Sequence, residues 1–221
     1  MKQYPIARDG WPHIIIALLI SVALYFLKPW LSIIGLIFVV FFCFFFRNPK
    51  RTGPECPDDL ISPADGKVMS VTPLEEISDL EGPAVCITIF LSLFDVHINR
   101  APMSGEIFCR RYRPGKYLPA FKSHASELNE RNTIGIASGD RKILVHQITG
   151  FFARRIVCDV TPGDQVKQRQ RIGMIRFGSC TELVCSPDVK IKIKPGDRVK
   201  AGLTVLASFP EKQINTEQDS H

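Results

Sequence analysis

The sequence predicts an all-β domain that is preceded by an N-terminal hydrophobic helical hairpin. Three observations indicate this architecture. Residues 14–46 form an apolar run with a single ionisable side chain. The rest of the chain consists of short segments rich in β-branched and aromatic residues and bounded by Pro, Gly and Asp. One turn pattern, apolar-x-Pro-Gly-Asp-x-Val-Lys, occurs twice, in residues 160–175 and 193–207.

The apolar run is predicted to be a membrane segment that folds back on itself. It is longer than the about 20 residues with which one helix crosses the hydrocarbon of a bilayer, and Lys28 and Pro29 interrupt it near its middle. Basic residues flank both ends, which the positive-inside rule places in the cytoplasm. We therefore expect residues 1–46 to anchor the chain in the cell (inner) membrane, with the other residues on the cytoplasmic face. Each arm is slightly short, so both a spanning and a re-entrant hairpin stay open.

Composition narrows the functional classes. The seven cysteines include no Cys-x-x-Cys pair, which argues against a disulfide framework and against a zinc site and indicates a reducing compartment. The net charge of +6 suits a protein that rests on anionic lipid headgroups. We expect no nucleic-acid partner, because the chain has no recognition motif or basic helix, and we expect no metal.

Residues 47–221 are predicted to form one β domain. The lysines of the alternating segment "VKIKIK" are expected to share a solvated face. Residues 119–132 lack such alternation and are expected to be an excursion or a short helix. Strands are expected at residues 66–71, 84–98, 105–112, 142–150, 154–160, 172–177, 181–186 and 189–194.

The repeated Pro-Gly-Asp turns resemble the paired units of lipoyl and biotinyl carrier domains, which implies a barrel-sandwich fold. This resemblance also supplies an alternative function, a membrane-tethered lipoyl-like adaptor without catalysis. A carrier domain would place its modified lysine at the tip of a hairpin, commonly beside Met, and residues 47–221 contain no Met-Lys pair. Covalent carriage is thus disfavoured, and the adaptor stays as the alternative.

The pair Gly178-Ser179 joins two predicted strands, unlike the strand-to-helix elbow that holds a hydrolase serine. Glycine lets its carbonyl be approached closely, so the Ser179 hydroxyl could attack the carbonyl of Gly178 and convert the amide to an ester. Elimination would release the upstream chain, and hydrolysis of the resulting dehydroalanine would leave a pyruvoyl group. Such a group offers a carbonyl that forms a Schiff base with a substrate amine, which no standard side chain does.

With these motifs the chain resembles the phosphatidylserine decarboxylases, in their short bacterial and archaeal form. The matching segments occur in the family's order and span most of the chain: "FFFRNPKR", "SPADGKV", "FDVHINRAPMSG", "ASELNERN" and "RFGS".

The resemblance implies cleavage between Gly178 and Ser179, giving a β chain of residues 1–178 and an α chain of residues 179–221 that stay together as a heterodimer. The pyruvoyl cofactor would derive from Ser179. Phosphatidylserine would be converted to phosphatidylethanolamine and carbon dioxide, with membrane lipids as surroundings. An archaeal ether-linked serine lipid and further homo-oligomerisation are left open.

The resemblance also implies roles for three more residues. Asp65 in "SPADG" matches the family's processing aspartate, although taken alone it is an ordinary turn residue. His97 is the candidate histidine for self-cleavage, for decarboxylation or for both, although a lone histidine in an apolar strand is more often a core residue. Long-form members carry a second histidine near the position of Arg100, so Arg100 becomes the candidate for binding the substrate phosphate.

Overall fold

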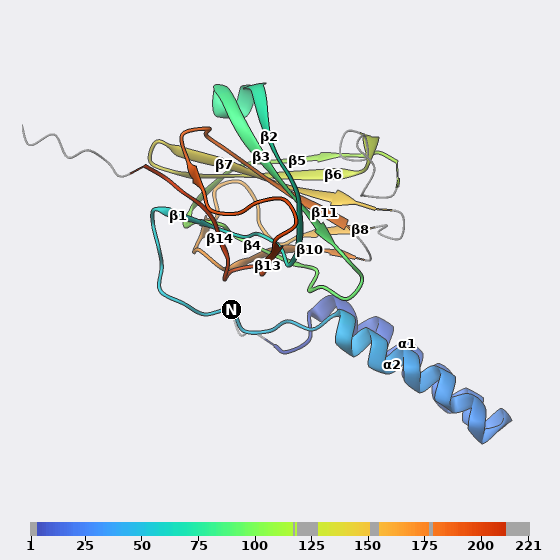
Figure 1. Cartoon of the computed structure of the whole chain (residues 1–221). Coiled ribbons are helices and arrows are strands. Elements are labelled where there is room, and N and C mark those ends of the chain that lie inside the picture. The colour runs from blue at the N-terminus through green and yellow to red at the C-terminus, as the bar shows by residue number, and fades with distance from the viewer. Residues whose placement is uncertain (1–3, 117, 119–127, 151–154, 177–178, 211–221) are drawn as a thin grey trace, which may run out of the picture.

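A computed structural model of the chain describes residues 4–116, 118, 128–150, 155–176 and 179–210, and for Ser179 it describes the backbone alone. A helical hairpin projects from a domain built of strands (Figure 1). The helices are α1 (Trp11–Leu27) and α2 (Ser32–Phe45), and the strands are β1 (Asp59–Ile61), β2 (Gly66–Ile77), β3 (Gly82–Leu91), β4 (Ile98–Arg100), β5 (Gly105–Arg113), β6 (Arg131–Ser138), β7 (Arg141–Thr149), β8 (Arg155–Cys158), β9 (Gln165–Val166), β10 (Arg171–Arg176), β11 (Ser179–Cys185), β12 (Lys190–Ile191), β13 (Arg198–Val199) and β14 (Val205–Ser208).

The two helices pack closely because small residues face each other. A Cβ atom added to Gly35 would lie 2.5 Å from the Cα atom of Ser21, and the Ser21 hydroxyl donates to the Ser32 carbonyl at 2.8 Å. The turn between them is the predicted break at Lys28 and Pro29, so the helical hairpin is confirmed. Within the described residues, the stretch Arg8–Leu27 has the length and apolar composition of a membrane span, and Pro29–Phe45 is shorter.

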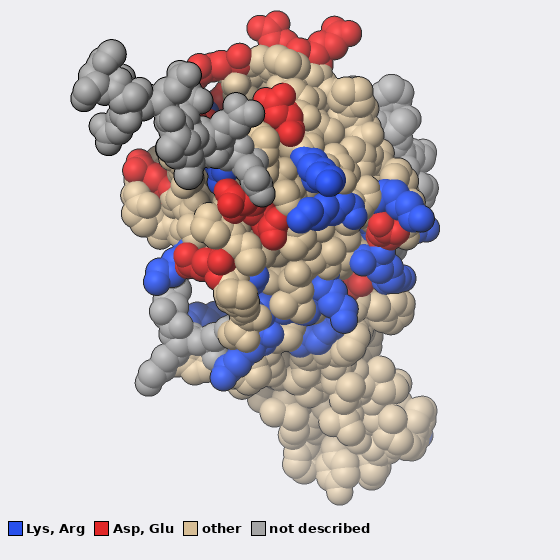
Figure 2. Space-filling view, turned by 60° about the vertical axis from the view of Figure 1, so that its left-hand side comes forward, with Lys and Arg blue, Asp and Glu red and all other residues tan. Residues whose placement is uncertain are grey.

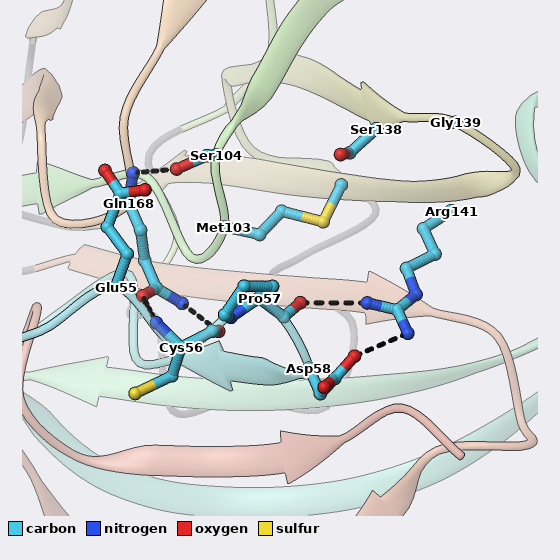
Figure 3. A pocket seen from close by; sticks show the side chains of 10 residues that line it. All are labelled: Glu55, Cys56, Pro57, Asp58, Met103, Ser104, Ser138, Gly139, Arg141 and Gln168. Carbon is cyan, nitrogen blue, oxygen red and sulfur yellow. Dashed lines mark hydrogen bonds and ion pairs between the residues drawn. The ribbon is translucent and has the colours of Figure 1, made fainter. Parts of the chain in front are cut away.

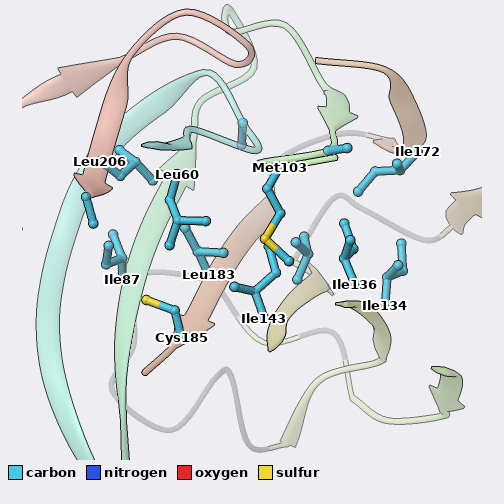
Figure 4. Packing of buried hydrophobic residues seen from close by; sticks show 14 of the residues in the cluster. Leu60, Ile87, Met103, Ile134, Ile136, Ile143, Ile172, Leu183, Cys185 and Leu206 are labelled. Carbon is cyan, nitrogen blue, oxygen red and sulfur yellow. The ribbon is translucent and has the colours of Figure 1, made fainter. Parts of the chain in front are cut away.

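The strands confirm the predicted all-β class with a barrel-sandwich form. Eight strands form one curled sheet in the order β13-β2-β3-β11-β7-β6-β5-β9, and two three-stranded sheets, β1-β14-β12 and β4-β10-β8, complete the domain. Alternate residues of the strands point inward and fill the interior with aliphatic side chains (Figure 4). The core includes Leu60, Ile87, Ile89, Met103, Ile134, Ile136, Ile143, Ile172, Leu183 and Leu206.

Several predicted segments differ in extent from the strands observed. The expected strand 66–71 continues to Ile77 in β2. The expected strand 84–98 is divided into β3 and β4, because the Asp95 carboxylate accepts hydrogen bonds from the backbone N–H and the hydroxyl of Ser92 and closes a turn. The segment 189–194 keeps its predicted alternation, with Val189 buried and its lysines exposed, but only β12 is paired. Residues 131–132 already belong to β6, so the expected excursion ends earlier; residues 119–127 lie outside the described residues.

The two Pro-Gly-Asp turns have the same geometry. Gly163 and Gly196 have φ angles of +92° and +100°, which favour glycine. Each glycine N–H donates at 2.8 Å to a strand carbonyl, that of Ile107 in β5 for Gly163 and that of Val68 in β2 for Gly196. The turns therefore dock in the same way on two different strands.

The receiving strands reveal that the repeat is larger than the turn. "SPADGKV" (residues 62–68) and "APMSGEI" (residues 101–107) occupy equivalent places: a Cβ atom on either Gly66 or Gly105 would lie 2.2 Å from a carbonyl oxygen of the neighbouring strand. The β domain thus consists of two similar halves. Asp65 in the first half stands where the second half has Ser104, and each accepts a hydrogen bond from a backbone N–H that follows its own Pro-Gly-Asp turn.

Candidate functional site

Ser179 begins the central strand of the large sheet. Its partners are Leu91, the last residue of β3, and Thr149, the last residue of β7. The chain leaves the β4-β10-β8 sheet at Arg176 and enters the eight-stranded sheet at Ser179. Gly178, the other half of the predicted cleavage site, lies outside the described residues. The predicted site therefore falls where the polypeptide passes from one sheet to the other.

His97 lies beside this crossing point. Its carbonyl accepts the N–H of Ile175 in β10 at 3.1 Å. The imidazole is fully buried, and its Nδ1 atom is 2.9 Å from the Asp95 carbonyl. Because a carbonyl only accepts, Nδ1 carries the proton and Nε2 carries the lone pair of a base. Burial lowers the pKa of His97 to about 4, so the imidazole is neutral at neutral pH.

Asp65 is at the same end of the sheet, directly before β2. Its carboxylate forms an ion pair with Arg51 at 2.8 Å through Oδ2, and its Oδ1 atom accepts the N–H of Ala201 at 2.7 Å. Burial raises the pKa of Asp65, and the charge of Arg51 lowers it in part. In the described hydrogen bonds, Asp65 is thus oriented by Arg51 and Ala201, whereas the main chain of Asp95 orients His97.

Arg100 is buried at the end of β4, with 5% of its surface exposed. Its guanidinium donates to the Asn48 side chain and to the Pro49 and Arg169 carbonyls, each at 3.0 Å. These acceptors are neutral, and burial lowers the pKa of Arg100 to about 10. Arg100 therefore holds the segment that leads from α2 into the β domain. Pro49, one of its acceptors, is two residues before Arg51, the partner of Asp65.

A buried polar network connects these strands and was not predicted from the sequence. Asn99 donates to the Thr181 hydroxyl at 3.0 Å, and the Gln147 amide donates to the Asn99 side-chain oxygen at 3.0 Å. Asn132 in turn donates to Gln147 at 2.7 Å. The network locks β4, which follows His97, onto β11, which begins with Ser179. The available signal was the asparagines within otherwise strand-like segments, since buried amides need partners.

A cavity of about 730 Å³, drawn in Figure 3, is lined by other residues. Its lining includes Arg141, Ser104 and Gln168. In the second half of the domain, Ser104 and Gln168 occupy the places that Asp65 and Ala201 have in the first half. Arg141 is bonded to Asp58 at 2.7 Å and to the Pro57 carbonyl at 2.9 Å. We propose the candidate site at the start of β11, at the end of the sheet that also holds Asp65, and not in this cavity. Among the described residues, no cluster of His, Cys, Asp and Glu suited to a metal ion occurs.

Comparisons with known proteins agree with the motifs. A family model described as "Phosphatidylserine decarboxylase" matches residues 38–207. A protein of Carboxydothermus hydrogenoformans called "Phosphatidylserine decarboxylase proenzyme" is 50% identical over 90% of this chain and 94% of its own length. Proteins with the same name from Symbiobacterium thermophilum and Syntrophus aciditrophicus are 42% and 43% identical, over 96% and 92% of this chain and 99% and 97% of their own lengths.

Proposed function

Because this chain belongs to the phosphatidylserine decarboxylase family, we propose that it converts phosphatidylserine to phosphatidylethanolamine and carbon dioxide after cleaving itself between Gly178 and Ser179. The observation that carries the proposal is the place of Ser179. Its backbone starts the central strand, at the end of the sheet that also holds Asp65, and next to the crossing point where His97 lies. The word "proenzyme" in the names of the relatives supports a processing step in those proteins.

Self-cleavage would use the residues of this end of the sheet. His97, neutral because of its burial, would take the proton of the Ser179 hydroxyl as that oxygen attacks the Gly178 carbonyl. The resulting ester would be eliminated, which leaves a carboxylate on Gly178 and dehydroalanine at position 179. Water would then convert the dehydroalanine to the pyruvoyl group with loss of ammonia. Burial raises the pKa of Asp65, but Arg51 stabilises its ionised form, and in that form Asp65 would assist self-cleavage.

The surroundings of position 179 fit such a group. Cys180 and Thr181, which follow it, are buried, so bulk water is kept away from the downstream strand. Once formed, the pyruvoyl group would bind the substrate amine and would supply the electron sink for the electron pair that remains on the substrate carbon when carbon dioxide leaves. His97 would return a proton to the substrate carbon. Arg100, whose described acceptors are all neutral, would supply positive charge toward the substrate phosphate.

The two fragments would remain together as a heterodimer. β11 would open the α chain, and all seven of its residues pair with both β3 and β7 of the β chain. The α chain would also contribute β13, which pairs with β2, and β14, which pairs with β1. Cleavage therefore would leave a strand embedded in the middle of a sheet, which cannot depart without breaking ladders on both sides.

The helical hairpin would hold the enzyme at its lipid substrate. The ring of Phe45 at the end of α2 lies against the ring of His97, with centroids 4.4 Å apart. A membrane segment that ends on the candidate base would bring the site to the bilayer surface, on the cytoplasmic side according to the flanking charges. Substrate lipid would then arrive by lateral diffusion.

The decisive experiment compares purified wild-type protein with Ser179→Ala by denaturing gel and intact mass. The wild type is expected to yield residues 1–178 and 179–221, and the variant is expected to stay whole. Ser186→Ala, which removes a hydroxyl just beyond the end of the same strand, is the matched control and should split normally. An unsplit, catalytically silent wild type would favour the lipoyl-like adaptor. Assays with ester-linked and ether-linked serine lipids would identify the substrate tails.

A further inference from the structure

Phe94 projects from the turn between β3 and β4, residues 92–97, which we call the 92–97 turn. Its side chain is 73% exposed, more than any other large apolar side chain described outside residues 11–44. The turn is well ordered by its own bonds, because the Asp95 carboxylate accepts the Ser92 N–H at 2.8 Å and the Ser92 hydroxyl at 2.7 Å. A phenylalanine in this position exposes apolar surface to water, and insertion into a bilayer would remove that surface from water.

The 92–97 turn lies against the base of the hairpin. Arg47 donates to the Phe94 carbonyl at 2.6 Å, and the same guanidinium lies 4.0 Å from the ring centroid of Phe44 in α2. Val96 belongs to one apolar cluster with Phe45 and Phe46. Figure 1 shows this turn as the green loop next to the hairpin. Phe94 therefore sits at the level where the hairpin leaves the β domain.

Basic side chains lie near the 92–97 turn. Arg198, with 76% of its side chain exposed, is 3.6 Å from the Asp95 carboxylate. The exposed Lys67 is its partner in the pairing of β13 with β2. Figure 2 shows lysines and arginines gathered on the part of the β domain nearest to the mostly uncharged hairpin. An exposed apolar side chain on a turn with basic residues nearby is complementary to an anionic bilayer, where headgroup phosphates lie above acyl chains.

We propose that the 92–97 turn is a second membrane contact, in which Phe94 enters the headgroup region of an anionic bilayer while Arg47, Lys67 and Arg198 face lipid phosphates. The proposal rests on the membrane placement of the hairpin within the proposed function, and it does not depend on the pyruvoyl chemistry. Two separate contacts, the hairpin and the turn, fix the tilt of the β domain relative to the bilayer more closely than the hairpin alone. His97, which ends the turn, is thereby directed toward the lipid surface.

The test places a single tryptophan at the turn. Full-length protein carrying Trp11→Phe, Trp30→Phe and Phe94→Trp is reconstituted into vesicles of phosphatidylcholine and phosphatidylglycerol, an anionic lipid that the proposed reaction does not consume, with and without bromine on the acyl chains. We expect the emission of the Phe94→Trp reporter to be blue-shifted and strongly quenched by the brominated lipid. The matched control is Glu76→Trp in the same background, because residue 76 is exposed near the tip of the β2–β3 hairpin on the far side of the domain (Figure 1). This control should not be quenched.

A second arm tests the charges. Adding Lys67→Gln and Arg198→Gln to the reporter is expected to weaken the quenching, as is replacing phosphatidylglycerol by phosphatidylcholine throughout. Water-like, unquenched emission from the Phe94→Trp reporter would overturn the proposal. So would emission that is shielded from water but indifferent to bromine, which would indicate a second copy of the chain over the turn. Fragment formation is scored on the same samples, so a failure of self-cleavage is recognised separately from a failure of membrane contact.

Discussion

The ring of Phe45, the last residue of α2, packs on the ring of His97 with centroids 4.4 Å apart and an interplanar angle of 35°. Both side chains are fully buried. The hairpin is therefore not an appendage joined by a loose linker, because its final turn is part of the packing that keeps the candidate base out of water.

This contact predicts that Phe45→Ala will damage the β domain as well as the anchor. Removing a buried phenylalanine costs about 3 to 5 kcal/mol, and water entering the space would move the pKa of His97 back toward its ordinary value. Thermal unfolding and the rate of fragment formation measure the effect. Phe44→Ala is the control, since Phe44 is 43% exposed; equal losses in the two variants would contradict the role of the contact.

The buried histidines predict acid sensitivity. Burial lowers the pKa of His97 to about 4 and that of His146 to about 3, from an ordinary value of 6.5. At pH values between the ordinary pKa of 6.5 and the lowered pKa of each folded histidine, the unfolded chain binds a proton that the folded chain does not. The free energy of unfolding therefore falls as the pH decreases through this range. Each histidine contributes a slope of roughly 1 kcal/mol per pH unit.

Urea denaturation of the uncleaved Ser179→Ala chain, at several pH values below about 7, tests this slope. His146→Gln keeps a polar group near the Thr133 hydroxyl, which is 2.9 Å from His146 Nδ1, and should flatten the slope by one proton. A slope unchanged by this substitution would show that other groups dominate the titration.

The ion pair of Arg51 and Asp65 predicts a shift in the pH profile of self-cleavage. Both side chains are 11% exposed, so Arg51→Gln leaves a buried carboxylate without its cation, at a cost of about 3 kcal/mol. The pKa of Asp65, already raised by burial, would rise further.

With a folded pKa above the ordinary 3.8, ionised Asp65 opposes folding. The stability contributed by Asp65 therefore decreases as the pH rises from that value through the raised pKa, opposite in sign to the histidine effect. The acid limb of the self-cleavage rate should move to higher pH in Arg51→Gln. Lys50→Gln changes an exposed neighbouring cation and should leave the limb in place; identical shifts in both variants would indicate general electrostatics instead.

The two-half architecture predicts that Gly105→Ala is severely destabilising. The new Cβ atom would lie 2.2 Å from the Ala137 carbonyl oxygen, and two paired backbones would have to separate, with a loss of several kcal/mol of the kind seen for overpacking. At Gly82, where no atom lies within 4 Å of an added Cβ, alanine should change stability by about 0.5 kcal/mol or less. Chemical denaturation compares them, and similar midpoints would argue against the close approach.

Much of the fold could be predicted because its signals are local. The apolar run predicts a hairpin because it is longer than one membrane-spanning helix needs and because Pro29, directly after Lys28, interrupts the helix. Segments that are rich in β-branched residues and bounded by turn residues, such as 142–150, indicate strands. The second repeat, "SPADGKV" with "APMSGEI", could not be predicted because its two copies share only Pro and Gly and are equivalent through backbone contacts.

By itself, the sequence determined the class of the domain and the hairpin. Its resemblance to the family led us to propose four site residues: Ser179, His97, Asp65 and Arg100. Only the tertiary structure decided their partners. Arg51 reaches Asp65, Phe45 covers His97, and Asn99 bonds to Thr181 on a strand distant in sequence. The physical reason is that burial and hydrogen-bond partners, which set pKa values and orient side chains, arise from segments that meet only when the sheets close around one core.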